Sequence, residues 1–183
     1  MTSISFFRMF GYSGITSLHG LEKWFTEANH PVSLDFHETF TYCSDLTDIS
    51  ALAGWDVNYL VNNGGTSIPG WHYFAYSGVT SLHGLEDWDV SRLTSLNGLF
   101  RNMQSLEDIS AIEGWNVSNV TDMGTIFEGD ASIDSLSPII NWDVRNVTSF
   151  SSAFRNVPNN SNFSFTLLPG SIETNSGTYV PNS

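Results

Sequence analysis

The chain has a single cysteine, Cys43, among its 183 residues. One cysteine excludes an intrachain disulfide and a zinc site built from several thiolates. Basic residues are also scarce: 6 lysines and arginines stand against 19 aspartates and glutamates, giving a formal net charge of −13. Because such a chain repels phosphate groups, we expect neither nucleic-acid binding nor attachment to an anionic membrane.

Long hydrophobic runs are missing as well. None approaches the roughly 18 apolar residues that a membrane span needs, so we expect no direct membrane insertion. The first residues, MTSISFFRMFGYSG, lack the charged start and continuous apolar block of a signal peptide. The chain is nevertheless 40% hydrophobic and 14% aromatic, which is too apolar for a disordered protein. We therefore expect a folded domain with a continuous core.

Aromatic residues recur along the chain in a regular order. Tryptophans mark the repeat at Trp24, Trp55, Trp88, Trp115 and Trp142. A phenylalanine precedes each tryptophan, and one more follows the last: Phe10, Phe40, Phe74, Phe100, Phe127 and Phe154. The stretch from one tryptophan to the next is too short to bury its apolar side chains alone, so repeated units must stack on one another. The pattern indicates about six stacked coils.

Two apolar spacings alternate within each repeat. Between phenylalanine and tryptophan, every third residue is apolar, as in Val79, Leu82, Leu85 and Trp88. This spacing fits neither a plain strand nor an amphipathic helix, and we interpret it as a bending coil with a short strand in each turn. After the tryptophan, apolar residues at i, i+3, i+6 and i+7 predict a short two-turn helix: Leu93, Leu96, Leu99 and Phe100.

The repeats also set the expected domain boundaries. Residues 1–157 form the repeat solenoid, interrupted by an irregular loop at about 58–71, where Asn-Asn-Gly-Gly and Pro-Gly break the pattern. Residues 158–183 form a C-terminal cap and tail. Solenoids need such a cap, and we expect Phe163, Phe165, Leu167 and Leu168 to cover the last coil.

The segments WDVSRLTSLNGLF and WNVSNVTDMGTIF, at residues 88–100 and 115–127, resemble the BspA-like leucine-rich repeat. They are also similar to the repeats called DUF285. The resemblance implies a leucine-rich-repeat-like, right-handed solenoid, with a short parallel β-strand and a short helical or 3-10 segment in each coil. It further implies a secreted or cell-surface protein with a role in adhesion or ligand binding. No catalytic residues belong to this family pattern.

Stacked coils place equivalent residues in columns, and one set of columns makes an acidic surface on the predicted strand side. We predict a binding face there, formed by Asp48, His83, Glu86, Glu107 and Asp108. Repeat proteins commonly recognise partners on extended surfaces of this kind. The alternative is a solvated acidic face with no ligand.

A second column follows the tryptophans and holds Asp56, Asp89, Asn116 and Asp143. Oxygen ligands stacked at the coil spacing are compatible with Ca²⁺. Capping of each local turn is the preferred interpretation, because the column mixes asparagine with aspartate and both types cap turns. His19 and His83 stand in alternate coils, roughly 10 Å apart, so they do not share a metal ion. We expect no metal site or cofactor beyond this Ca²⁺ alternative.

The sequence contains no G-x-S-x-G elbow, P-loop or G-x-G-x-x-G segment. We therefore predict that the protein is not an enzyme but a binding or adhesion module for a protein or glycan partner. The alternative function is structural: a rigid rod, or a subunit that self-associates in an extracellular or virion assembly.

Overall fold

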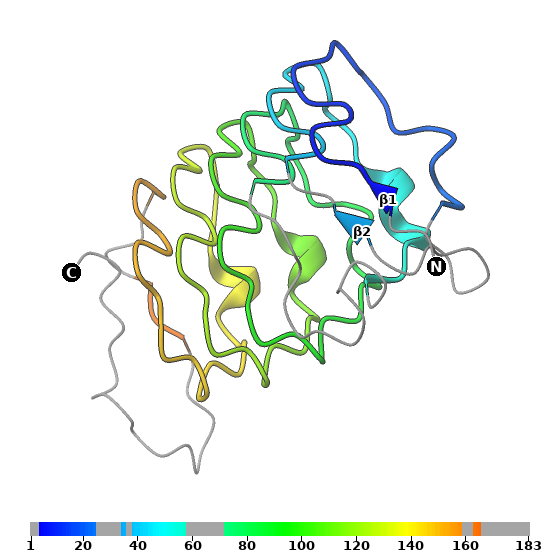
Figure 1. The fold of residues 1–183 in the computed structure, drawn as a ribbon. Helices are drawn as coiled ribbons and strands as arrows, with labels where there is room; N and C mark the ends of the chain where they lie inside the picture. The colour runs from blue at the N-terminus through cyan, green and yellow to red at the C-terminus, as the bar shows by residue number, and fades with distance from the viewer. Residues whose placement is uncertain (1–3, 25–33, 36–37, 58–71, 159–162, 166–183) are drawn as a thin grey trace.

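The computed structural model describes residues 4–24, 34–35, 38–57, 72–158 and 163–165. In this part the chain winds back on itself in successive coils that lie side by side (Figure 1). The N-terminal coils form one end of the stack and the coil that contains Phe154 lies toward the other. The predicted irregular loop at about 58–71 lies outside the described residues.

Regular secondary structure is sparse among the described residues. Two strands of two residues each, β1 (Ile4–Ser5) and β2 (Leu34–Asp35), pair in parallel with Ile4 opposite Leu34. Isolated parallel bridges join Ser81 to Asp108, Ser95 to Asp122 and Asp122 to Ser149. The helices are short 3-10 turns: η1 (Ser50–Gly54), η3 (Ser110–Ile112) and η4 (Ser137–Ile139). Turns and irregular backbone make up the rest.

The predicted fold class, a leucine-rich-repeat-like solenoid with a strand and a short helix in every coil, is therefore wrong. The described coils at Phe100 and Phe127 contain bridges of single residues where that class requires strands. The 3-10 turns also lie in the period-three segments, where strands were predicted, and not after the tryptophans, where helices were predicted.

The period of three has a different cause from the predicted strand. Leu85 donates its backbone N–H to Leu82, and Trp88 donates to Leu85, so each apolar residue closes a turn on the apolar residue three before it. The same bonds recur in the coils that end at Trp24, Trp55, Trp115 and Trp142. A 3-10 turn has 3.0 residues, so side chains at i and i+3 lie above one another. Successive turns of this type therefore direct every third side chain to the core.

The segment predicted as a two-turn helix forms consecutive tight turns instead. Gly98 and Asn102 have φ angles of 67° and 59°, in the left-handed region, which a right-handed helix excludes. Alternate N–H groups of this segment bond to the next coil, from Leu96 to Asp122, from Gly98 to Gly124 and from Phe100 to Ile126. The N–H groups between them close turns within the coil, as from Leu99 to Leu96. The apolar spacing is thus helix-like, but the hydrogen bonds run between coils.

Two aromatic columns fill the core. The rings of Trp88, Trp115 and Trp142 stack with centroids 6.4 Å apart, and each indole N–H donates to a carbonyl of the preceding coil, as from Trp115 to Leu85. The Phe100 and Phe127 rings stack at 5.5 Å. Aromatic pairs contribute about 0.5–1.5 kcal/mol beyond burial. These columns therefore fix the register of the coils, although few strands are present to do so.

The C-terminal end of the stack is covered by aromatic side chains. Phe163 and Phe165 contact Phe154 at centroid distances of 5.5 and 6.2 Å, and Phe165 also contacts Phe150. Leu167 and Leu168, also expected in the cap, lie outside the described residues. No helix in the described part of the chain is long and apolar enough to cross a membrane.

Candidate ligand-binding face

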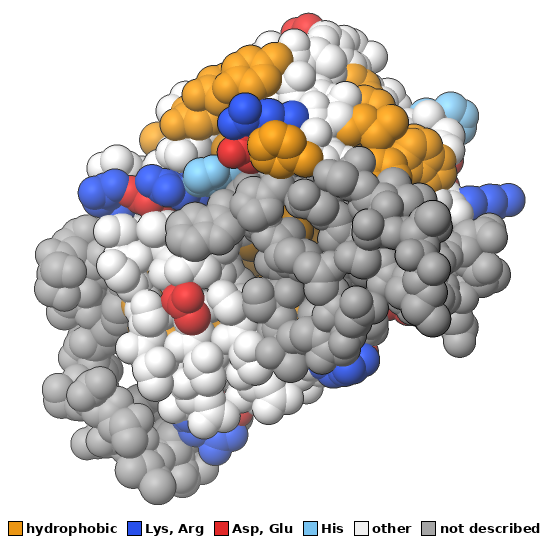
Figure 2. Space-filling model, viewed as in Figure 1, with side chains coloured by type: hydrophobic (Ala, Val, Ile, Leu, Met, Phe, Trp, Pro, Cys, Tyr) orange, Lys and Arg blue, Asp and Glu red, His pale blue; other side chains and the backbone are white. Residues whose placement is uncertain are grey.

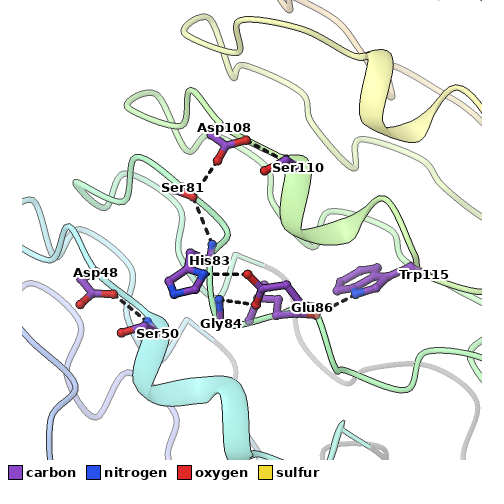
Figure 3. A network of polar contacts seen from close by, with 10 residues as sticks. Asp48, Ser50, Ser81, His83, Gly84, Glu86, Asp108, Ser110 and Trp115 are labelled. Atoms are coloured by element: carbon purple, nitrogen blue, oxygen red, sulfur yellow. Dashed lines mark hydrogen bonds and ion pairs between the residues drawn. The ribbon is translucent and has the colours of Figure 1, made fainter.

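The face predicted from the sequence lies beside the 3-10 turns. All five candidates are exposed: Asp48, His83, Glu86, Glu107 and Asp108. They come from three neighbouring coils, and the close view shows four of them, with Asp48 bonded to Ser50 apart from the contacts that link His83, Glu86 and Asp108 (Figure 3). We call this set the acidic face.

Asp48 and Asp108 occupy equivalent places just before η1 and η3. One carboxylate oxygen of Asp48 accepts the Ser50 backbone N–H at 2.8 Å, and one of Asp108 accepts the Ser110 N–H at the same distance. Such bonds from residue i+2 define Asx turns, which aspartate and asparagine form readily. Each carboxylate therefore orients the start of a 3-10 turn.

His83 and Glu86 form a second local unit. His83 Nδ1 lies 2.7 Å from one oxygen of Glu86, whose other oxygen accepts the Gly84 N–H at 2.7 Å. The same arrangement occurs two coils earlier, where His19 pairs with Glu22 at 2.8 Å and Glu22 accepts the Gly20 N–H. The repeated sequence SLHGLE is therefore one structural unit used twice.

Ser81 connects this unit to the next coil. Its hydroxyl accepts the His83 N–H at 3.2 Å and donates to Asp108 at 3.2 Å (Figure 3). Gly84 fits closely against the coil before it, because a Cβ atom there would lie 2.6 Å from the Ser50 Cα, and its φ is 103°. At the acidic face, the close approach of Gly84 to Ser50 therefore joins the first of the three coils to the second. The bond from Ser81 to Asp108 joins the second coil to the third.

Three carboxylates of the acidic face, those of Asp48, Glu86 and Asp108, have lowered pKa values. The N–H of Ser50 lowers the pKa of Asp48, and the N–H of Ser110 lowers the pKa of Asp108. His83 lowers both pKa values further through its charge, since it lies between the two. Partial burial raises the pKa of Glu86, but hydrogen bonds from its own N–H, His83 and Gly84 outweigh burial and leave the pKa below its usual range.

Glu107 differs from the other four candidates. Its backbone N–H donates to Thr80 at 2.9 Å, and its carbonyl accepts the Asp134 N–H at 3.1 Å. Its side chain is exposed. Glu107 thus contributes backbone to the contacts between coils and negative charge to the surface.

The column after the tryptophans makes local turns, as the capping interpretation predicts. Asp89 accepts the Ser91 N–H at 3.0 Å, and Asn116 accepts both the N–H and the hydroxyl of Ser118. Asp143 bonds to Arg145, whose guanidinium lowers the pKa of that carboxyl. Within the described ranges, no group of three or more His, Cys, Asp or Glu side chains is arranged to hold a metal ion.

The structure also contains an exposed feature that the sequence analysis did not predict. Tyr12, Tyr42 and Tyr76 stack with centroids 4.7 and 4.5 Å apart and nearly parallel planes, and we call them the tyrosine ladder. Tyr12 is 65% exposed and Tyr42 44%. Each lies two residues after a phenylalanine of the repeat. Aligning the repeats residue by residue therefore places the three tyrosines in one column, and this was the available signal.

Buried polar residues were missed as well. Glu128 is almost fully buried and pairs with Arg101 at 2.8 Å and with Arg155. Asp130 is fully buried, with one oxygen accepting the Met103 N–H at 2.7 Å, and burial raises its pKa well above the usual range. Both residues contact neighbouring coils from inside the stack, so they are parts of the frame and do not line the acidic face.

Sequence comparison identifies the family. A family model described as "Mycoplasma protein of unknown function, DUF285" matches residues 72–166, more than half of the chain. The chain belongs to the DUF285 family. The DUF285 match includes His83, Glu86, Glu107 and Asp108, whereas Asp48, Tyr12 and Tyr42 lie before it. None of the curated proteins and none of the solved structures matches the chain significantly.

Proposed function

We propose that this DUF285 chain is a non-enzymatic binding module that recognises a protein or glycan on its acidic face. The observation that carries the proposal is that exposed carboxylates of three neighbouring coils lie on one face, where Ser81 links the His83 backbone to Asp108 and the charge of His83 lowers the pKa of both Asp48 and Asp108. Because each carboxylate is oriented by its own turn, the face is preorganised, and preorganisation lowers the entropic cost of binding.

We further propose that the module belongs to a secreted or cell-surface protein with BspA-like repeats. The segments at residues 88–100 and 115–127 support this proposal through their resemblance to repeats with that role. The acidic character of the face favours partners that carry amines, guanidinium groups or hydroxyl donors, because ionised carboxylates accept strong hydrogen bonds from such groups.

The test is a binding screen on cells and on a glycan array with charge variants. Asp48→Asn and Asp108→Asn remove charge while retaining an acceptor for the i+2 N–H. Glu107→Lys reverses a charge whose side chain lies outside these turns. We expect the triple variant to lose at least about tenfold in affinity, since contacts at the centre of an interface dominate its energy.

The matched control is Asp143→Asn, which changes an equivalent turn in the column after the tryptophans, where Asn116 already occurs naturally. It should leave binding unchanged. Unchanged binding of the triple variant, with the fold intact by circular dichroism, would exclude the acidic face as the site.

A further inference from the structure

Asp130 differs from the carboxylates at the surface of the stack. In Figure 2 the acidic side chains in view lie at the surface, with basic side chains beside some of them. Asp130 is fully buried. One of its oxygens accepts the Met103 N–H, whereas the other is buried without a hydrogen-bond partner in the described part of the chain. An ionised carboxylate with an unpaired buried oxygen is unfavourable, so these surroundings favour the protonated side chain.

Asp130 occupies a position of the repeat that is uncharged in the other coils. It lies three residues after Phe127, and the equivalent residues are Ser13, Cys43, Ser77, Met103 and Val157. Met103, Asp130 and Val157 each donate a backbone N–H to the phenylalanine three residues before, so they close the same turn in three successive coils. Met103 and Val157 are buried. The fold therefore accepts an apolar or a small polar side chain at this position and does not require a carboxyl group.

The charged side chains of the three coils do not compensate Asp130. Those nearest to its column along the chain are Arg101, Glu107, Glu128, Asp134 and Arg155. The two arginines pair with Glu128, and the other two carboxylates are exposed. Burial raises the pKa of Asp130 well above its usual range against the opposing effect of the Met103 N–H, and neither influence comes from a charged side chain.

The two neighbouring coils differ in how they accommodate a negative charge on Asp130. In the Phe100 coil, the Met103 N–H already donates to the carboxyl group, and such a bond strengthens when the acceptor is ionised. In the Phe154 coil, the equivalent residue is Val157, whose side chain has no donor. A charge on Asp130 therefore favours the contact with the Phe100 coil and opposes the contact with the Phe154 coil.

We propose that loss of the Asp130 proton opens the contact between the Phe127 coil and the Phe154 coil. The proton passes to solvent, water reaches the unpaired oxygen, and the Phe127 ring loses its stacking on Phe154 at 6.0 Å. Arg155 separates from Glu128, which keeps Arg101 as its partner. Each repeat of a stack contacts only its neighbours, so the earlier coils stay assembled. The stack then contains a switch that opens as pH rises.

Hydrogen exchange between about pH 5 and pH 8 tests the proposal, with each rate divided by the intrinsic rate at the same pH. The outer set comprises N–H groups that donate to the Phe154 coil, those of Met123, Thr125, Phe127 and Gly129. The inner set comprises equivalent groups one coil earlier, those of Leu96, Gly98, Phe100 and Asn102. We expect protection of the outer set to fall by up to about tenfold per pH unit, the limit for release of one proton. The inner set opens only with more of the stack, so it should be at least about tenfold more protected at each pH.

Variants assign the pH dependence to Asp130. Asp130→Ser introduces the residue type that Ser13 and Ser77 supply at the equivalent position, and it should abolish the fall in protection. Asp130→Asn, which keeps the shape of the side chain and removes its charge, should do the same. Asp134→Asn is the matched control, because it neutralises an exposed carboxylate of the same coil, and it should leave the fall unchanged.

Three results would overturn the proposal. The first is outer-set protection in the wild-type chain that does not vary with pH. The second is a fall that persists in Asp130→Ser and Asp130→Asn. The third is equal protection of the outer and inner sets, which would mean that the coils open together. The acidic face lies on the coils of Phe40, Phe74 and Phe100, which stay assembled, so the two proposals fail separately.

Discussion

The early and late coils share a left-handed backbone position but place different residue types there. The residue two positions after each core phenylalanine is left-handed throughout, with φ between 58° and 90°. The early coils place tyrosine there and the late coils place asparagine or glycine, as follows: Tyr12, Tyr42 and Tyr76 against Asn102, Gly129 and Asn156. The frame therefore needs a left-handed residue, but it does not need tyrosine. The tyrosine ladder is an addition to the early coils, and its cost of about 1–2 kcal/mol per residue is offset in part by stacking.

The largest expected effect concerns the core that the two regions share. Phe127 is fully buried between Phe100 and Phe154, whereas Phe10 is half-buried and stacks on Phe40. We expect Phe127→Ala to lower the free energy of unfolding by about 3–5 kcal/mol. Phe10→Ala should lower it by about 1–2 kcal/mol, because less apolar area is lost. Urea titrations followed by fluorescence and circular dichroism measure both; equal losses would show that the first coil is packed as tightly as the later ones.

The left-handed column itself supplies the next test. At Gly129, φ is 90° and a Cβ atom would lie 2.4 Å from the Asn102 side-chain oxygen, so Gly129→Ala should cost about 1–2 kcal/mol. Tyr76→Asn should change stability by less than about 1 kcal/mol, because relief of strain offsets the lost stacking. Gly114→Ala, at a site with open space, is the control. A large loss from Tyr76→Asn would mean that the ladder is mainly structural.

The early and late coils should also differ in how pH changes their contribution to stability. Asp130 occupies a column that holds Ser13, Cys43 and Ser77 in the early coils. Since burial raises its folded pKa above the unfolded value, its protonated form is favoured by folding, and stability is lost as pH rises through the folded pKa. We expect Asp130→Asn to become increasingly stabilising relative to wild type as pH rises from acid to neutral.

Comparing wild type with Asp130→Asn at each pH isolates the contribution of Asp130 to the free energy of unfolding. Asp48, Asp108 and Glu86 have lowered pKa values, so their contribution has the opposite sign and is lost as pH falls, equally in both proteins. Thermal unfolding across the pH range measures the difference. A difference that does not vary with pH would show that folding does not raise the pKa of Asp130.

The smallest expected effect concerns the turns of the acidic face, which the two regions share. Asp48→Ala should lower stability by about 0.5–1 kcal/mol through loss of the Ser50 bond. Asp48→Asn should be close to neutral, because the amide oxygen accepts the same bond. Asp108→Ala should cost somewhat more, since Asp108 also accepts from Ser81. Equal costs for the alanine and asparagine variants at Asp48 would contradict the turn assignment.

Many of the buried core positions could be predicted from the sequence, but the local backbone structure could not. The tryptophan and phenylalanine columns are buried where the repeat placed them, with Trp24 and Phe10 of the first coil only partly so. The strand assignment failed because a spacing of three describes successive 3-10 turns as well as a bending strand. The helix assignment failed because the hydrogen bonds of that segment, such as Phe100 to Ile126, join coils and leave no mark within one repeat.

The exposure of the acidic face was predictable from the sequence, whereas its local contacts were not. Column alignment identified exposed residues of the acidic face, but not the turns that hold Asp48 and Asp108 or the pairing of His83 with Glu86. The repeated SLHGLE sequence was the available signal for that pair. Nothing in residue preferences predicts tyrosine in a left-handed conformation, because bulky side chains avoid that region. The tyrosine column could be found by aligning the repeats, but its left-handed backbone could not.

The central claim, that hydrogen bonds between coils and not a helix hold the segment after each tryptophan, can be measured directly by native-state hydrogen exchange. The amides of Leu96, Gly98 and Phe100 donate to carbonyls of the next coil, so all three should exchange slowly. Rapid exchange at Leu96 with slow exchange at Asn97 and Leu99, the pattern of a two-turn helix that begins at Leu93, would contradict the account.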